Sequence, residues 1–308
     1  MVTIQGISKF KNTLPTAITI GTFDGVHIGH RQILERLINN AKHANLNSVL
    51  VTFFPHPRMI LQKESNLKLL NTLDEKIEIL EGLGLDYVIV HPFTKEFSRL
   101  SAIEFVRDIL VNQLKAKKII IGYDHRFGRN RNANINDLIT FGNTLDFEVE
   151  EISAQEVDEV SVSSTKIRTA LEEADIATAN SYLGYAFMLT GTVKKGKGLG
   201  RQLDFPTANI KIAEAYKLIP KNGVYVVQSF IDGKTYHGMM NIGFNPTVKG
   251  KEKSIEVHFF DLNQDLYDKK IKVELLHHLR DEHKFDSVED LKQQLVKDKQ
   301  ASLALIAN

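Results

Sequence analysis

The segment Gly21-Thr22-Phe23-Asp24-Gly25-Val26-His27-Ile28-Gly29-His30 places two histidines around a glycine. An apolar, β-prone run precedes it and a helical pattern follows it, so a strand leads into a helix here. Such a junction offers free backbone N–H groups and the positive end of a helix dipole, which suit a phosphate chain. Gly29 would let a nucleotide approach the backbone, and His27 and His30 would donate hydrogen bonds to phosphate oxygens. The pattern favours transfer of a nucleoside monophosphate from a nucleoside triphosphate; a strand–turn–helix that merely carries histidines is the alternative.

A second phosphate-type pattern is Ser163-Ser164-Thr165-Lys166-Ile167-Arg168, where another helical pattern begins. Hydroxyl groups, free N–H groups and basic side chains at a helix N-terminus can clamp a polyphosphate. An ordinary N-cap with solvated basic side chains has the same composition. Because the segment occurs together with the two histidines, we expect Ser164, Thr165 and Arg168 to belong to one phosphate site.

Two further segments end expected strands and so lie at the edge where parallel sheets bind ligands. Phe53-Phe54-Pro55-His56-Pro57 would either offer Phe54 as a stacking face for a planar ligand or form a stiff loop over core aromatics. Gly122-Tyr123-Asp124-His125-Arg126-Phe127-Gly128 is followed by Arg129 and Arg131. These arginines would either contact phosphate or remain solvated loop charges.

The segment Gly191-Thr192-Val193-Lys194-Lys195-Gly196-Lys197-Gly198 is similar to a P-loop but fails as one. Gly198 stands where Ser or Thr should contact Mg²⁺, and the residues that follow are not a helical pattern. A basic loop of this kind can still fold over nucleotide phosphates, or it can be solvated.

Thr207 and Asn209 stand two residues apart and would face one side of an extended chain. A hydroxyl and an amide oxygen there suit Mg²⁺ or an ordered phosphate; a polar turn is the alternative. In the run Ser254–Phe260, Glu256 and His258 alternate with apolar residues. A carboxylate on a rigid strand suits a general base for a substrate hydroxyl, although a strand glutamate can also simply face solvent.

Strand and helix patterns alternate over residues 1–183, which predicts a parallel sheet covered by helices on both faces. Capping boxes are expected at Thr72 with Glu75 and at Ser101 with Glu104. The expected strands are 17–20, 48–54, 87–90, 118–122 and 147–152.

From Gly184 to residue 308 the pattern changes to short strands punctuated by turns, which predicts a small antiparallel barrel. Asp232-Gly233 is a hairpin signal, and a final helix is expected from Ser287. The expected strands are 187–193, 208–212, 223–231, 236–242, 254–260 and 271–276.

Bulk composition narrows the class of protein. The chain has 308 residues, 43% hydrophobic and 25% charged, with a net charge of +1. This is the composition of a soluble globular protein without the polycationic surface that holds nucleic acid. The absence of cysteine excludes disulfides, thiolate zinc sites and cysteine nucleophiles. Neither a signal peptide nor a membrane-spanning run is present, so we expect a cytoplasmic protein.

Taken in order, these segments resemble the bifunctional prokaryotic FAD synthetases, in which riboflavin kinase is joined to FMN adenylyltransferase. The resemblance covers essentially the whole chain. It rests on GTFDGVHIGH (21–30), FFPHP (53–57), GYDHRFG (122–128), SSTKIR (163–168), GRQLDFPTAN (200–209), NGVYVV (222–227), MNIGFNPT (240–247), IEVHFFD (255–261) and LRDEHKFDS (279–287).

The resemblance implies a Rossmann-like nucleotidyltransferase domain over residues 1–183 and a flavokinase barrel over residues 184–308. His27 and His30 would be catalytic in adenylyl transfer and Glu256 in phosphorylation, with Thr207 and Asn209 holding Mg²⁺. Flavin would contact Phe54, Asp124 and Arg280. ATP and its phosphates would contact Gly21, Phe23, Gly29, Ser164, Thr165, Arg168, Gly191, Lys197 and Gly198.

The implied substrates are riboflavin, FMN and ATP, with Mg²⁺ as the metal. We expect neither a nucleic-acid nor a membrane partner, and a monomer or weak homo-oligomer. His125 stands where the family commonly has an aromatic residue, and Asp204 and Asp268 replace common glycines.

Three other classes of protein fit parts of the pattern. A class I aminoacyl-tRNA synthetase fragment shares the letters HIGH at 27–30, but no KMSKS-like loop or basic face accompanies them. A single-activity nucleotidyltransferase with an unrelated β module is opposed by Thr207, Asn209 and Glu256. A flavin-binding regulatory protein on the same fold stays open.

Overall fold

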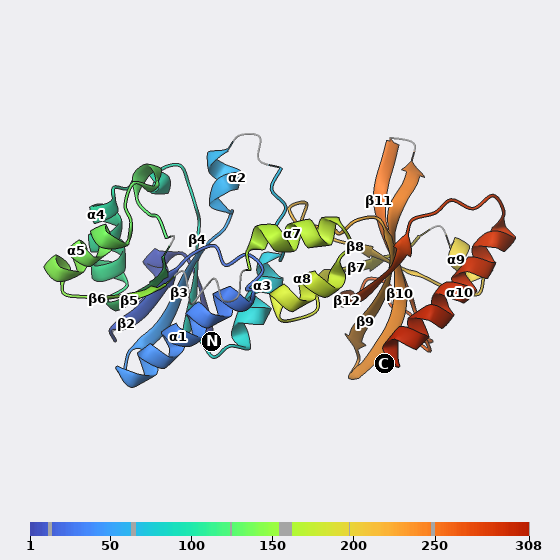
Figure 1. Cartoon of the computed structure of the whole chain (residues 1–308), viewed down its shortest axis with the longest axis horizontal. Helices are drawn as coiled ribbons and strands as arrows, with labels where there is room; N and C mark the ends of the chain where they lie inside the picture. The colour runs from blue at the N-terminus through green and yellow to red at the C-terminus, as the bar shows by residue number, and fades with distance from the viewer. Residues whose placement is uncertain are drawn as a thin grey trace. The chain divides into compact units, whose positions relative to one another are not determined.

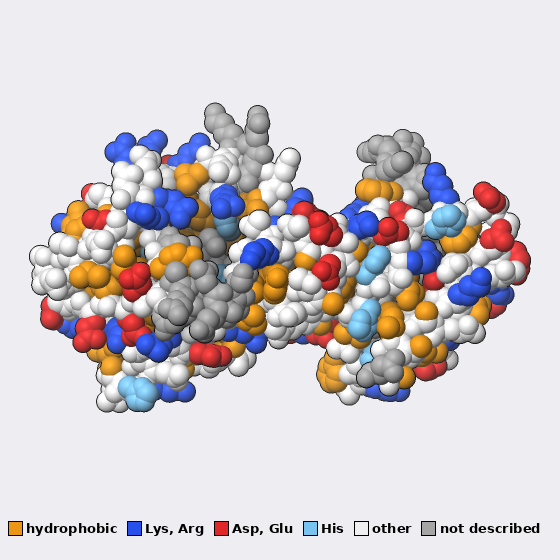
Figure 2. All heavy atoms as spheres, viewed as in Figure 1, with side chains coloured by type: hydrophobic (Ala, Val, Ile, Leu, Met, Phe, Trp, Pro, Cys, Tyr) orange, Lys and Arg blue, Asp and Glu red, His pale blue; other side chains and the backbone are white. Residues whose placement is uncertain are grey.

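The computed structural model describes residues 1–11, 14–62, 66–123, 125–153, 162–196, 198–247 and 250–307. The chain divides into two compact units, Met1–Ser164 and Thr165–Asn308. Among the residues so described, every helix is too short or too polar to cross a lipid bilayer. Acidic and basic side chains are interspersed on the face shown in Figure 2, in keeping with the small net charge.

The first unit is built on a parallel six-stranded sheet in the order β1-β4-β3-β2-β5-β6 (Figure 1). Its strands are β1 (Val2–Gln5), β2 (Thr16–Ile20), β3 (Asn47–Phe53), β4 (Tyr87–His91), β5 (Ala116–Gly122) and β6 (Glu148–Ile152). The five predicted strands are confirmed, with ends that differ by one or two residues. β1 is an addition: it has four residues, lies at an edge of the sheet and is only partly buried, so its apolar signal is weak.

Helices cover both faces of this sheet. Ala17 and Leu50 belong to the cluster formed with α1 (Ile28–His43) and α3 (Leu73–Glu81), whereas the adjacent residues Ile18 and Val49 belong to the opposite cluster. That second cluster includes η3 (Phe105–Gln113), a helix of π-type turns, and α5 (Ile135–Leu145). Alternation of strand side chains between two apolar clusters confirms the predicted two-sided covering.

Both predicted capping boxes are present. The Thr72 side chain accepts from the Glu75 N–H at the start of α3, and Ser101 does the same for Glu104 at the start of α4. The remaining short helices of the unit are α2 (Pro57–Leu61), α4 (Ala102–Glu104), η1 (Ile7–Lys9), η2 (Phe97–Arg99) and η4 (Arg129–Arg131).

The strand order places a ligand edge beside β2. The chain runs outward from β2 through β3 to β4 and then returns to β5 on the other side of β2. Ligands of open parallel sheets bind beyond the carboxyl ends of the strands where the order reverses in this way. The turn that follows β2 carries the two histidines, so the fold positions them at this edge.

The second unit is a closed antiparallel barrel in the order β10-β11-β8-β7-β12-β9, which confirms the predicted barrel. At the hairpin between β9 and β10, Asp232 and Gly233 have φ of +49° and +86°, as the Asp-Gly signal predicts. β10 and β12 run farther than expected, and β11 begins four residues earlier than expected. The strands are β7 (Met188–Lys194), β8 (Ala208–Lys211), β9 (Gly223–Ile231), β10 (Lys234–Thr247), β11 (Gly250–Phe259) and β12 (Lys270–Asp281).

The helices described with the barrel are α7 (Ser164–Glu172), α8 (Ile176–Leu183), α9 (Leu199–Gln202) and α10 (Val288–Ile306). Asn180 of α8 donates its side-chain amide to the Leu275 carbonyl of β12, 2.8 Å away. Ser287 caps α10 as predicted, and Leu291 and Leu295 of that helix pack on the barrel. Because α7 and α8 pack with the barrel, the compact units divide after Ser164; the boundary at 183/184 stays a prediction about the two activities.

Candidate active sites

The turn between β2 and α1 has an unusual backbone. Phe23, Gly25 and Val26 have φ of +47°, +88° and +37°. Left-handed angles are uncommon for phenylalanine and strained for a β-branched valine, and such strain persists only where the surroundings fix it. Phe23 and Val26 are both buried here, so core packing supplies part of that constraint.

His27 both caps the helix and faces the site. Its Nδ1 accepts the backbone N–H of His30 at 3.3 Å, so His27 is the N-cap of α1. An unprotonated Nδ1 leaves the proton of the neutral ring on Nε2. The His27 and His30 rings are stacked with centroids 3.6 Å apart and an angle of 17°, and the Phe23 ring lies 4.8 Å from His30. The structure therefore brings together both predicted histidines and Phe23.

Both histidines are neutral at pH 7. Burial lowers the pKa of His27 from 6.5 to about 4. The pKa of His30 lies well below its ordinary value, chiefly through burial and then through the charges of His27 and Lys76. Within the described part of the chain, His30 Nδ1 is buried without a hydrogen-bond partner. Each ring can thus offer an N–H to an anion without carrying a full charge.

Asp24 ties the turn to its surroundings. It is 6% exposed, and its Oδ1 accepts the Leu70 N–H at 3.0 Å. Its carbonyl accepts the Ser164 hydroxyl at 2.9 Å, so the structure brings Ser164 to the histidine turn. Thr165 and Arg168 belong to the second unit, and their contact with phosphate stays a prediction.

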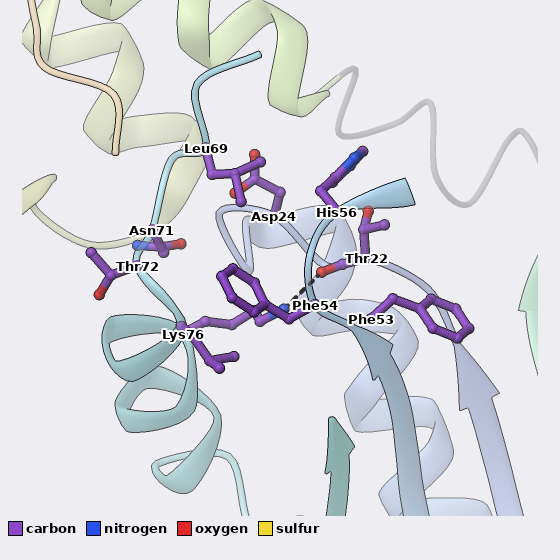
Figure 3. A pocket seen from close by; sticks show the side chains of 10 residues that line it. Thr22, Asp24, Phe53, Phe54, His56, Leu69, Asn71, Thr72 and Lys76 are labelled. Carbon is purple, nitrogen blue, oxygen red and sulfur yellow. Dashed lines mark hydrogen bonds between the residues drawn. The ribbon is translucent and has the colours of Figure 1, made fainter. Parts of the chain in front are cut away.

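Phe54 lines a pocket beside this turn together with Asp24, His56 and Lys76 (Figure 3). The pocket lies beyond the end of β3, where the sequence predicts a stacking face. Asp124 lies outside the described residues. His125 stacks on Phe127, with centroids 6.1 Å apart.

Gly21 and Gly29 of the first site differ in how much space the structure leaves for a side chain. A Cβ at Gly21 would lie 2.9 Å from the Phe23 ring, so Gly21 is needed for the turn itself. A Cβ at Gly29 would make only ordinary contact, 3.5 Å from the His27 ring. Space in the free protein therefore does not require a glycine at position 29, and the role of Gly29 toward a ligand stays a prediction.

In the barrel, Thr207, Asn209 and Glu256 come together. Glu256 of β11 and Asn209 of β8 are direct cross-strand partners. The Thr207 hydroxyl donates to Glu256 Oε2 at 3.2 Å. A hydroxyl, an amide oxygen and a carboxylate are the hard oxygen donors that Mg²⁺ takes alongside phosphate oxygens, so the residues fit the expected metal.

The backbone around these donors is closely packed. His258 Nδ1 and the Pro206 carbonyl, next to Thr207, are 2.9 Å apart, and His258 is 8% exposed. A Cβ at Gly196 would collide with the Asn209 amide, so the loop after β7 lies directly on that side chain. His258 is thus buried beside the site rather than facing solvent.

The predicted phosphate-binding glycines of the barrel have structural roles of their own. A Cβ at Gly191 would lie 2.7 Å from the Lys211 carbonyl, so β7 and β8 require a glycine here. Gly198 has a φ of +75° at the start of α9. Lys197 lies outside the described residues. Asp204 and Asp268, which replace common glycines, have φ of +65° and +60° and so adopt the glycine-like conformation.

Arg280, a predicted flavin contact, is held by the C-terminal helix. Its Nε and Nη2 donate to the Asp298 carboxylate at 2.9 and 2.7 Å, and Asp298 is 2% exposed. Gln294 donates to the same carboxylate at 2.8 Å. The guanidinium is therefore fixed at the base of the segment that follows β12.

The predicted sites do not include Lys76, His258 or Asp298, which are buried polar residues that contact them or support their backbone. A signal exists for Lys76, because it lies three residues after Leu73 and four before Leu80 and so on the apolar face of α3. A lysine at a core position is unusual unless it is paired. Pro206, the partner of His258, and Arg280, the charged partner of Asp298, lie on other elements, 52 and 18 residues away, and local patterns do not reveal them.

Comparison with known proteins agrees with this geometry. A family model described as FAD synthetase matches residues 9–166, and one described as riboflavin kinase matches residues 183–306. A bifunctional riboflavin kinase/FMN adenylyltransferase of Buchnera aphidicola is 39% identical over 97% of this chain and 96% of its own. One from Listeria monocytogenes is 37% identical over 94% and 92%. A crystal structure from Streptococcus pneumoniae, described as a macrolide-efflux protein, is 30% identical with a TM-score of 0.89 and covers 98% of this chain and 99% of its own.

Proposed function

The chain belongs to the bifunctional riboflavin kinase/FMN adenylyltransferase family and makes FAD from riboflavin by way of FMN. We propose that the barrel carries the kinase reaction and that the parallel-sheet domain carries the adenylyl transfer. This division is supported by the observation that each unit holds a different set of side chains, one suited to binding phosphate and one suited to removing a proton. Stacked neutral histidines lie in the first unit, whereas the Thr207–Glu256 pair lies in the second. We assign the activities to residues 1–183 and 184–308.

In the kinase reaction, Glu256 accepts the proton of the riboflavin 5′-hydroxyl. The hydroxyl oxygen then attacks the γ-phosphorus of ATP, and ADP leaves. A neutral alcohol is a weak nucleophile, so a base contributes to this step. Thr207 donates to the Glu256 carboxylate and so orients it on β11. Mg²⁺, held by Thr207 and Asn209 with ATP, would neutralise charge on the phosphates.

In adenylyl transfer, the FMN phosphate attacks the α-phosphorus of a second ATP, and pyrophosphate leaves. A phosphate monoester has a second pKa of about 6 and is already largely ionised at pH 7, so a general base is unnecessary. His27 and His30 donate N–H groups to phosphate oxygens, and Ser164, Thr165 and Arg168 complete the clamp. These groups act by positioning and by stabilising charge.

Further contacts complete the proposal. Phe54, Asp124 and Arg280 contact flavin. Gly21, Phe23 and Gly29 contact ATP in the first domain, and Gly191, Lys197 and Gly198 do so in the second. We propose Mg²⁺ as the ion that accompanies ATP, a cytoplasmic enzyme without a nucleic-acid partner, and a monomer or weak homo-oligomer.

The test uses two variants of the full chain with chromatographic separation of riboflavin, FMN and FAD. Glu256→Gln should fail to make FMN from riboflavin but should convert supplied FMN to FAD. His30→Ala should stop at FMN. Glu274→Gln, which changes another barrel carboxylate that accepts from Gln228, is the matched control and should keep both activities. FMN formation by the first variant or FAD formation by the second would refute the corresponding assignment.

A further inference from the structure

Lys76 is a buried cation that the proposed reactions do not yet use. It projects from the apolar face of α3 and is 7% exposed. A buried lysine destabilises a protein unless its ammonium is paired and hydrogen-bonded. A buried lysine beside the histidine turn therefore needs partners that offset the cost of burying its charge.

The ammonium joins three elements. Nζ donates to the Thr22 carbonyl at 3.2 Å and to the Thr52 hydroxyl at 3.0 Å. Thr52 in turn donates its hydroxyl to the Thr22 carbonyl at 3.2 Å, which closes a three-membered network. Figure 3 shows the Lys76 side chain reaching Thr22 at the wall of the pocket that both residues line. The network thus ties α3 and the end of β3 to Thr22, the second residue of the turn.

That turn needs fixed ends because its interior is strained. Phe23 and Val26 have left-handed φ, and the turn leads directly to the capping residue His27. At its far end, Arg31 Nε donates to the Val26 carbonyl at 3.3 Å. At its near end, Lys76 holds Thr22. Small movements of Thr22 would pass through a stiff turn to the histidine rings.

The charge of Lys76 also reaches the histidines. It is one of the causes that keep the pKa of His30 low, after burial and His27. Burial lowers the pKa of Lys76 itself from 10.5 to about 8, against the opposing effect of Asp24. A cation in a partly desolvated place attracts phosphate groups more strongly than one in water does.

Resting on the proposed role of the two histidines, we propose that Lys76 is a positioning residue for adenylyl transfer, holding the turn of residues 21–26 and adding positive charge beneath the phosphate site. It acts through Thr22 and the turn and makes no contact with the reacting atoms. The kinase reaction does not depend on it.

The first experiment measures kcat/KM for adenylylation of supplied FMN by the full chain between pH 6.5 and 9.5. In the wild type, this value should decline above pH 8 as Lys76 loses its proton. Among the described residues, Asp24, His27, His30 and His56 are titratable groups at the turn or pocket, and the charged Arg31 side chain donates to the turn. Comparison of the Lys76 and Thr52 variants with the wild type therefore shows whether the decline in kcat/KM comes from Lys76.

Lys76→Met should lower kcat/KM at pH 7.5 by about ten- to a hundred-fold, the usual effect of losing hydrogen bonds from a charged group, and should remove the decline. Lys76→Arg should recover part of the activity and keep it to pH 9.5, because a guanidinium stays charged. Thr52→Val removes one acceptor of the ammonium and should move the decline to lower pH. A merely structural role would not shift a pH profile.

The control is Lys217→Met, which removes another buried lysine, from the second unit, and should leave adenylyl transfer and its pH profile unchanged. Wild-type kcat/KM in Lys76→Met, or an unshifted decline in both Lys76→Met and Thr52→Val, would overturn the proposal. If Lys76→Met fails to fold, Lys76→Arg and Thr52→Val still decide it. FAD formation by His30→Ala would instead refute the proposed function on which this inference rests.

Discussion

Replacing His27 by asparagine separates its role in folding from its role in chemistry. The Nδ1 of His27 accepts the His30 N–H as the cap of α1, and an asparagine side-chain oxygen can accept the same bond. The variant therefore keeps the cap and loses the imidazole. It also removes a group whose protonation would break the cap.

The change in unfolding free energy with pH follows from the pKa of His27, which is about 4 in the folded protein against an ordinary 6.5. Between these values the unfolded chain binds a proton that the folded chain does not, so the folded state loses stability as the pH falls from 6.5 toward 4. Each pH unit is worth about 1.4 kcal/mol, so the full loss is about 3 kcal/mol. Above pH 6.5 this contribution is constant.

Urea unfolding followed by circular dichroism at pH 7.0 and pH 4.5 measures this loss. The first unit of His27→Asn should lose about 2 to 3 kcal/mol less than that of the wild type between the two pH values. At pH 7.0 adenylyl transfer should nevertheless fall, because the amide does not reach where Nε2 lay. The control is His43→Asn at the exposed end of the same helix, which should keep the wild-type pH dependence. Equal losses in wild type and His27→Asn would refute the reasoning.

Two further variants probe the barrel. Asp298→Ala should cost about 3 to 5 kcal/mol of unfolding free energy in urea, because it leaves the Arg280 guanidinium without its buried partner; a loss below 1 kcal/mol would show that the pair adds little. His258→Leu should raise KM for Mg·ATP in the kinase assay, because it releases the Pro206 carbonyl next to Thr207. His258→Asn, with an amide donor near the position of Nδ1, should restore KM, and equal KM values for the two would contradict a positioning role.

Much of the fold was predictable because burial leaves a local trace in the sequence. The inner strands β2 and β3 are apolar on both faces, and the capping boxes at Thr72 and Ser101 occur as predicted. β1 was missed because an edge strand of four residues buries little. β12 runs on to Asp281 by pairing with β9 through two irregularities, which a strict alternation pattern does not anticipate.

The site residues that belong to a local sequence motif were predictable. His27, His30 and Ser164 gather around one turn, and Thr207 and Glu256 share a hydrogen bond. The supporting residues were not predictable in the same way. Lys76 finds its partners on two other elements. Arg280 was predicted only as a flavin contact, whereas the structure pairs it with Asp298, eighteen residues later, through the packing of α10.

The closed barrel affects which unit can fold first while the chain is being synthesised. β12 pairs with both β7 and β9, so each of these largely buried strands has only one of its two barrel neighbours until residues 270–281 have been made. The parallel sheet, by contrast, has all its strands once Ile152 is present. The first unit can therefore assemble on the ribosome well before the second, whose pairing is non-local and must wait. A chain interrupted before residue 270 would carry a finished sheet beside an open, aggregation-prone set of strands.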